Sequence, residues 1–499
     1  MKIHLISPRL SVHKGDFLGS GVPYWPVELA VFATFLREAG NDVFVCDLFG
    51  HSPGTFSEEG DVYWQGANIE AVDDLEDDAA LFVIYAISYM SLSELESIVA
   101  YLRSKFGQSK IAVLENSQAV TAFDLEAEGD RMFDAGADFL ILGEPYFNWD
   151  QISAFVAGDK VVPKNVKTPT TSETIRRQYD KYGDYPVPAW DLFPVENYWA
   201  LPYSHGPKRA RKYFPILTSR GCPWPCDFCV VPTTNDRLWR GRSPDNIVDE
   251  IIELRDRFGV YHFQLEDLNP TVNWPRFAAF CEALIARKAG ITFSIASGTK
   301  AETIALDAVP LLAKAGCRYL SISPESGSER LMRIIGKAFN YDHAEQLVRA
   351  CQKHNIRTQA CFLVGHPSET EVDFIASCDY MRRLLHRGLD EVAIFIVSPF
   401  AGSALHQDSR IALSDKEIQP TFGPKGRAEQ KLYSQRRSIM MRLFFTEKLK
   451  RGVDLWMQGL RAVFFSPQTK MENLPKRVLF VLTRVILAKC MTVFSRPKI

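Results

Sequence analysis

The sequence predicts an α/β protein with two domains of alternating strands and helices, followed by a helical region. Short β-rich apolar runs alternate with amphipathic helical patterns along most of the chain. A stretch rich in Pro, Thr and aromatic residues interrupts this alternation at about residues 161–213. With 499 residues the chain is too long for one ordinary core, and its 46% of apolar residues is enough to fill two or three.

The first domain, residues 1–158, is expected to be a doubly wound, Rossmann-like parallel sheet. Its predicted strands alternate with helical patterns such as residues 26–40, the arrangement that connects parallel neighbours. The strands are expected at residues 2–8, 41–49, 81–88, 110–116 and 138–146. The acidic stretch at residues 58–78, which also contains glycine, is predicted to be a solvated insertion.

The second domain, residues 213–402, follows a linker or clasp at residues 159–212 and is expected to be a partial (β/α)6, TIM-like barrel. Ser243 and Pro244 supply an N-cap and a first residue for its first helix. Its six strands are expected at residues 213–219, 261–267, 291–297, 319–326, 357–365 and 391–399. In barrels of parallel strands, functional side chains gather at the carboxyl ends of the strands.

The charge balance argues against a nucleic-acid partner. The chain has 58 Lys and Arg against 60 Asp and Glu, so it carries no strong overall field. Its first apolar run is short and ends at a proline and a charged loop, unlike a signal peptide, so a cytoplasmic location is expected. Thiols stay reduced there, and a tight cysteine cluster in that compartment indicates a metal site or catalysis.

Three cysteines form such a cluster in RGCPWPCDFC, directly after the first barrel strand: Cys222, Cys226 and Cys229. A structural zinc site uses four ligands, usually in two close pairs, and neither the distant Cys46 and Cys281 nor the nearest histidines, His205 and His262, complete one. Three closely spaced thiolates instead suit a [4Fe–4S] cluster with one iron left open. An incomplete zinc site is the alternative.

The CxxxCxxC spacing of these cysteines resembles the signature of the radical S-adenosylmethionine (SAM) superfamily. The resemblance extends to four later segments at strand ends, LEDLNP (265–270), SPESGSERLMRIIGK (323–337), FLVGHPSETE (362–371) and SPFAGSAL (398–405). It implies a cluster held by the three cysteines and an external one-electron reductant of the flavodoxin or ferredoxin type. It also implies that SAM contacts Phe228, Glu266, Asp267, Ser323, Glu325, Gly365 and Ser398.

Structural roles are the alternative for several of these residues. Glu266 and Asp267 are alternatively acids exposed to solvent at the end of a strand, and Gly365 suits a tight turn. Ser326 suits the N-cap of the following helix. Four further cysteines are expected to be small core residues: Cys317, Cys351, Cys361 and Cys378.

A Rossmann-like domain ahead of such a barrel resembles the cobalamin-binding subfamily, as does GADFLILGEPY at residues 136–146. No D-x-H-x-x-G motif follows the first strand, so no histidine for cobalt is evident. In LENSQA (114–119), Glu115 and Asn116 stand where the subfamily generally has Gly-Gly beside the nucleotide tail. The resemblance therefore implies either bound cobalamin or a relict domain that acts as a lid over the barrel.

The region 403–499 is expected to be helical and basic. From Lys448 onward it has eleven basic residues and two acidic ones, so its net charge is +9. The apolar run at residues 478–494 is interrupted by Arg484 and Lys489 and is too short to span a bilayer comfortably. A helix lying on an anionic membrane surface and a helix packed on the barrel are the two interpretations.

The leading hypothesis is a radical SAM enzyme that functionalises an unactivated carbon of a small-molecule or lipid-like organic substrate by cobalamin-dependent methyl transfer. The first alternative is radical C–H functionalisation without methyl transfer, such as cyclisation, coupling or rearrangement. The second is a non-catalytic iron–sulfur electron carrier or sensor. Nothing in the sequence identifies a residue that donates or removes hydrogen during the reaction.

Overall fold

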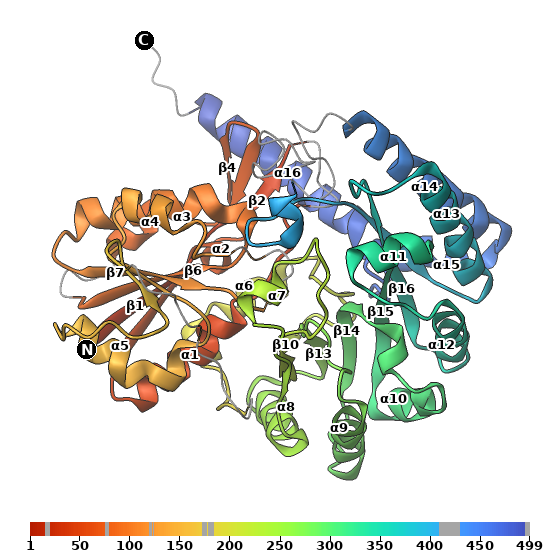
Figure 1. The fold of residues 1–499 in the computed structure, drawn as a ribbon, viewed down its shortest axis with the longest axis horizontal. Coiled ribbons are helices and arrows are strands. Elements are labelled where there is room, and N and C mark those ends of the chain that lie inside the picture. Colours follow the sequence, from red (N-terminus) through yellow and green to blue (C-terminus); the bar gives the residue numbers. More distant parts are fainter. Residues whose placement is uncertain are drawn as a thin grey trace.

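The computed structural model describes residues 1–14, 20–74, 79–118, 122, 124–171, 177, 184–408 and 430–494. Figure 1 shows the N-terminal domain and the barrel side by side, with the carboxyl-terminal helices α14–α16 along one side of the molecule. The two strand-and-helix domains and the helical end agree with the predicted fold class.

The N-terminal domain is built on a six-stranded sheet in the order β3-β1-β6-β7-β8-β9, parallel except for β9. Alternate residues of β6 pack on opposite faces, with Val83 in the cluster that contains α1 and Phe82 in the cluster that contains α3. The strands are β1 (Lys2–Ser7), β3 (Asp42–Asp47), β6 (Leu81–Ala86), β7 (Lys110–Glu115), β8 (Phe139–Ile141) and β9 (Val166–Lys167). The helices are α1 (Val27–Glu38), α2 (Leu48–His51), α3 (Leu92–Lys105), α4 (Gly129–Ala135) and α5 (Trp149–Val156).

The prediction of a solvated insertion at residues 58–78 is wrong for residues 63–67, which are buried, whereas residues 58–61 are exposed. β2 (Leu10–His13), β5 (Val62–Gln65) and β4 (Phe56–Glu59) form a small antiparallel sheet, followed by a 3-10 turn at Ile69–Asp74. Phe56 and Tyr63 are buried against Val481 and Val485 near the end of the chain. The surface that covers this stretch therefore comes from a distant segment. Residues 75–78 lie outside the described residues.

The barrel is a parallel sheet in sequence order, β10-β13-β14-β15-β16-β17. Its strands are β10 (Phe214–Ile216), β13 (His262–Leu265), β14 (Thr292–Thr299), β15 (Cys317–Glu325), β16 (Arg357–Val364) and β17 (Glu391–Ile396). The helices are α8 (Pro244–Phe258), α9 (Trp274–Ala286), α10 (Val309–Ala315), α11 (Glu329–Ile335), α12 (Tyr341–Lys353) and α13 (Glu371–His386). The short elements β11 (Ser219–Arg220), α7 (Val231–Thr234) and β12 (Arg240–Gly241) surround the cysteine loop.

The helix caps confirm one prediction and correct another. Ser243 caps α8 by accepting a hydrogen bond from the Asn246 amide, and Pro244 is the first helical residue. The N-cap of α11 is Ser328, whereas Ser326 hydrogen-bonds to Ser377 of α13. The capping alternative for Ser326 is therefore wrong.

The segment between the domains packs aromatic side chains against both. It contains a 3-10 turn (Trp190–Leu192) and α6 (Val195–Ala200), while residues 172–176 and 178–183 lie outside the described part. Trp190 is buried between Trp25 of the first domain and Phe214 of the barrel. These contacts are supplemented by an ion pair between Arg220 and Glu28, whose Nε–Oε1 distance is 2.8 Å.

The carboxyl-terminal region consists of α14 (Gln430–Lys450), α15 (Val453–Phe464), a 3-10 turn (Met471–Asn473) and α16 (Leu474–Phe494). α14 packs on α13 and β17, and α15 packs on α16. Among the described residues, no helix is both long enough and apolar enough to cross a membrane.

Candidate active site between the two domains

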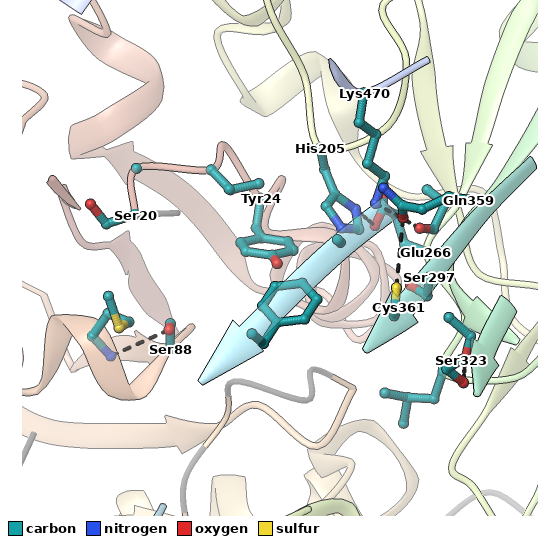
Figure 2. A pocket seen from close by; sticks show the side chains of 18 of the residues that line it. Ser20, Tyr24, Ser88, His205, Glu266, Ser297, Ser323, Gln359, Cys361 and Lys470 are labelled. Carbon is teal, nitrogen blue, oxygen red and sulfur yellow. Dashed lines mark hydrogen bonds and ion pairs between the residues drawn. The ribbon is translucent and has the colours of Figure 1, made fainter. Parts of the chain in front are cut away.

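A cavity of about 920 Å³ lies at the carboxyl ends of both sheets. Its walls come from four parts of the chain: the N-terminal domain, the interdomain segment, the barrel and the carboxyl-terminal helices. Figure 2 shows Tyr24, His205 and Lys470 entering it from three of these parts, with His205 and Lys470 beside Glu266 of the barrel. Both parallel sheets place their strand ends here, as expected for a ligand site in such folds.

The cysteine loop leaves the barrel at Gly221, whose φ of +74° and contact with a backbone oxygen leave no space for a side chain. Cys222, Cys226 and Cys229 all line the cavity. The amide of Cys229 donates to the carbonyl of Cys226 at 3.2 Å, so the loop is folded back on itself. The loop thus brings all three predicted ligands to the mouth of the barrel.

Burial disfavours the charged thiolates in the protein without metal. It raises the pKa of Cys222 and Cys229, and it raises that of Cys226 to about 11. Lys337 opposes this effect at all three thiols. Metal binding must therefore release protons here, and the ammonium of Lys337 favours that release.

The donor set fits an iron–sulfur cluster. Within the described ranges, no three His, Cys, Asp or Glu side chains are placed around one point as a single metal ion requires. A [4Fe–4S] cube has separate irons for separate thiolates, so its three ligands do not share one point. Thiolates are soft ligands that bind iron well. The apolar Phe228 and the buried ammonium of Lys337 beside them suit a cluster that carries negative charge together with its thiolates.

The sequence alone assigns no role to Lys337, although this residue ends the segment 323–337. Its Nζ donates to Glu325 Oε1 at 2.6 Å and to both oxygens of Ser323 at 2.7 Å. Burial opposes the charge, but Glu325 and the thiols raise the pKa of Lys337 above its ordinary value. Glu325 itself has a φ of +57°, a strained conformation that is common at functional sites.

Two buried polar atoms remain available to a ligand on this wall. Ser398 Oγ and Trp224 Nε1 both line the cavity, and neither has a hydrogen-bond partner among the described residues. A buried polar group without a partner costs free energy, roughly 1–3 kcal/mol, that a bound polar ligand recovers. These atoms, with Ser323 and Glu325, fit the polar groups of SAM.

The cavity lining includes five of the seven predicted SAM contacts, namely Phe228, Glu266, Ser323, Glu325 and Ser398. Asp267 lies elsewhere, because its carboxylate accepts hydrogen bonds from the amide and hydroxyl of Thr218 and from Ser219. Gly365 lies under α14, where the ring of Tyr433 approaches the position of a Cβ to 2.8 Å. Asp267 thus joins the segment after β10 to the segment after β13, and Gly365 packs against α14.

A second polar group, not found from the sequence, surrounds Glu266. Its carboxylate pairs with His205 Nδ1, and the ring of Tyr24 lies against His205 with a centroid distance of 4.8 Å. Lys470 Nζ donates to the carbonyl of Ala296 at 2.8 Å. Burial lowers the pKa of both His205 and Lys470; Glu266 opposes this effect at His205, and Cys361 and Glu266 oppose it at Lys470. No sequence motif joins these residues.

Two further residues position the cysteine loop. His366 Nε2 lies 2.9 Å from the carboxylate of Asp227, between the second and third cysteines. From the N-terminal domain, Gln118 Oε1 accepts a hydrogen bond from the amide of Gly221 at 3.2 Å. The loop is therefore held from both domains.

The carboxyl edge of the N-terminal sheet fits cobalamin only in part. Ile87 and Met90 give the cavity an apolar margin suited to a flat ring. The position of the subfamily's Gly-Gly is filled, however, because Glu115 accepts a hydrogen bond from the amide of Gly143 and pairs with Arg177 at 2.9 Å. Asn116 donates to the carbonyl of Ile87 at 2.8 Å. This edge has room for a ring but not for a nucleotide tail beside β7.

Comparison with known proteins identifies the barrel. Residues 216–381 match the model of the Radical SAM superfamily. The chain is 27% identical over 232 residues to cytidylyl-2-hydroxyethylphosphonate methyltransferase of Streptomyces wedmorensis, covering 44% of this chain and 42% of that protein. It is 31% identical over 212 residues to the anaerobic magnesium-protoporphyrin IX monomethyl ester cyclase of Synechocystis sp., covering 42% of this chain and 40% of that protein. The matches span less than half of either relative.

The resemblance in fold is more extensive. The cobalamin-dependent SAM radical enzyme OxsB, solved with aqua-cobalamin bound, matches 98% of this chain and 80% of its own with a TM-score of 0.62 and 12% identity. At that identity the match shows the shared fold of both domains. Residues 216–381 are thus similar to the Radical SAM superfamily, and the chain as a whole has a two-domain fold similar to that of OxsB.

Proposed function

We propose that this chain is a radical SAM enzyme that functionalises an unactivated carbon of an organic substrate, with cobalamin-dependent methyl transfer as the leading reaction. The observation that carries the proposal is one cavity that contains three thiols, a buried Lys–Glu pair and unpartnered polar atoms. When bound, a reduced cluster and SAM supply a carbon radical able to abstract hydrogen from an unactivated C–H bond.

The residues of this chain orient and protect that chemistry. Cys222, Cys226 and Cys229 would hold three irons, and Glu325 with Ser323 would hold polar groups of SAM. The N-terminal domain covers the barrel mouth through residues such as Glu28, whose ion pair with Arg220 keeps the two domains together. A cover of this kind excludes water and competing hydrogen donors from the cavity.

Methyl transfer is supported by the methyltransferase relative and by the cobalamin-bound neighbour that shares the fold. Radical C–H functionalisation without methyl transfer is the second candidate, supported by the Glu115–Arg177 pair that fills the tail position and by the cyclase relative. A simple electron carrier or sensor would need no cavity of about 920 Å³ around its metal ligands.

Anaerobic reconstitution tests the proposal. The loaded chain is expected to release 5′-deoxyadenosine from SAM in the presence of a strong reductant, and no cleavage by a fully loaded, reduced cluster would refute an enzymatic role. Cobalamin in the purified chain, seen by visible spectra and extraction, together with S-adenosylhomocysteine as a product, supports methyl transfer. 5′-Deoxyadenosine without either supports the second candidate.

We further propose two partners for the chain. SAM cleavage consumes an electron that has to come from an external reductant of the flavodoxin or ferredoxin type. The basic carboxyl-terminal region would place a cytoplasmic enzyme at the inner membrane surface, because anionic lipids attract Lys and Arg. The substrate is then a small-molecule or lipid-like organic compound, and nucleic acid is not expected as a partner.

A further inference from the structure

The amphipathic helix α15 has its apolar side turned outward. Its polar side faces the protein, where Gln458 donates to the carbonyl of Asp390 at 3.2 Å and Arg461 pairs with Glu472 at 2.9 Å. The apolar residues Val453, Trp456, Met457, Val463 and Phe464, with Phe465 just beyond the helix, are exposed. Trp456 is 67% exposed and Phe464 is 73% exposed. A helix of a globular protein normally buries this side.

α16 repeats the pattern at its outer side. Val481 and Val485 pack on the small β2–β4–β5 sheet, whereas Leu479, Leu482, Ile486 and Leu487 are exposed. α15 and α16 pack on each other, and Lys476 of α16 donates to the carbonyl of Phe465 at 2.9 Å. We call the exposed apolar residues of these two helices the outer apolar surface. Single exposed apolar residues are ordinary, but helical stripes of them mark an interaction surface.

Charge around the outer apolar surface is positive. Between residues 448 and 489 the chain has nine Lys and Arg and two acids, Asp454 and Glu472. Lys448, Arg477 and Glu472 are buried, and Lys470 lines the cavity. At the surface Lys450 pairs with Glu447, Arg451 with Asp454 and Lys489 with Glu58, so the positive charge left beside the apolar residues comes from Lys476 and the exposed Arg484. A second copy would bring a surface of the same net positive charge to this one, which disfavours self-association.

The same region forms part of the cavity wall. Met471, in the 3-10 turn before α16, and Leu474, the first residue of α16, line the cavity together with Met441 and Phe445 of α14. Phe445 is also 42% exposed, so the cavity wall reaches the molecular surface at α14. Helix α15, which presents part of the outer apolar surface, packs against α14, the helix that contributes this part of the cavity wall.

We propose that the outer apolar surface docks the enzyme on an anionic lipid bilayer and that the cavity takes a lipid-like substrate from that bilayer. The choice of substrate class rests on the proposed function, whereas the docking does not. Trp, Phe and Leu facing outward with Lys and Arg beside them are the pattern of interfacial helices that lie in the headgroup region. Each Lys or Arg near an anionic surface strengthens binding further.

Co-sedimentation of the reconstituted full chain with lipid vesicles tests the docking. Vesicles of phosphatidylcholine with about 30% phosphatidylglycerol are expected to bind at least tenfold more chain than phosphatidylcholine alone, less strongly at high salt. The double variant Trp456→Ser/Phe464→Ser is expected to lose tenfold or more of the binding. The matched control Val372→Ser/Ile375→Ser removes apolar residues that are 76% and 52% exposed on α13 and should bind like the parent.

Equal binding of the parent and the Trp456→Ser/Phe464→Ser variant, or no binding of the parent to the anionic vesicles, would overturn the docking proposal. So would a parent dimer that the same double variant converts to monomer, because a second copy would then cover the surface. Release of 5′-deoxyadenosine is measured in parallel without vesicles. Failure of the docking thus stays distinguishable from failure of the radical SAM function.

Discussion

The two walls of the cavity are assembled in different ways. The barrel wall takes its chemistry from the strand ends of one sheet: the cysteine loop after β10, Glu325 at the end of β15 and Ser398 after β17. The facing wall joins Tyr24, His205 and Lys470 from three distant segments. Chemistry held by one scaffold leaves compact motifs in a sequence, whereas a wall that is assembled from distant segments leaves none.

Removing one thiol from the barrel wall is expected to have the largest effect on activity. Cys226→Ala is expected to lose the iron–sulfur cluster and more than about 99% of SAM cleavage, because an iron without its thiolate is readily lost. Iron and sulfide content and 5′-deoxyadenosine release measure the effect. Cys378→Ala on α13 is the control, since this thiol lies outside the cavity lining and should leave the cluster intact. A Cys226→Ala chain with full cluster content would exclude that thiol as a ligand.

Removing Lys337 tests whether the barrel wall needs more than its ligands. Lys337→Met leaves Glu325 buried without its cation and is expected to cost about 3 kcal/mol of stability and roughly 10- to 100-fold in SAM cleavage. The double variant Lys337→Met/Glu325→Gln should recover most of the stability, because no charge is left unpaired, but not the cleavage. Recovery of both in the double variant would make this pair merely structural.

The sequence was sufficient to predict most of the barrel wall. Its strands alternate with helices in order, so motif position and strand end coincide, and Phe228, Ser323, Glu325 and Ser398 lie where the pattern places them. Asp267 and Gly365 do not line the cavity, and for Asp267 the reason is the geometry of a strand end. Adjacent residues at a strand end point to opposite sides, so Glu266 reaches the cavity while Asp267 turns back to Thr218.

The facing wall could not be predicted in the same way. His205 is a lone histidine in an irregular segment, and Lys470 is one of many cations in a basic region. Only packing of the whole chain brings both near Glu266. The buried β5 strand shows the same limit, because Val481 and Val485, which cover its sheet, are more than 400 residues away in the sequence.

Two buried histidines, one in the barrel and one in the facing wall, should make the stability of the chain depend on pH to different extents. Burial lowers the pKa of His262, on β13, to about 3, so the folded chain keeps it neutral. The unfolded chain binds a proton at this residue below about pH 6.5, so stability is lost as the pH falls from about 6.5 toward 3, by about 2 kcal/mol at pH 5. His262→Gln should remove this loss. Urea midpoints of the cluster-free chain at pH 7.5 and 5 measure it.

His205→Gln is the matched variant on the facing wall. Burial also lowers the pKa of His205, but Glu266 acts in the opposite direction. The acid loss of stability attributable to His205 should therefore be smaller than that of His262. Equal changes in the two variants would mean that Glu266 gives His205 no compensation.

The smallest expected effect concerns Gly365, where the barrel meets α14. Its φ of +85° disfavours any side chain, and a Cβ would also meet the ring of Tyr433 at 2.8 Å. Gly259→Ala is the control, since Gly259 has a φ of +67° and open space around it. The control should cost about 1 kcal/mol and Gly365→Ala about 1 kcal/mol more, because only the latter has to displace a packed ring. Urea unfolding measures both, and equal costs would show that α14 yields freely at this contact. In that case α14 would be a movable part of the cavity wall, whereas a clear difference would make it as fixed as the strands it covers.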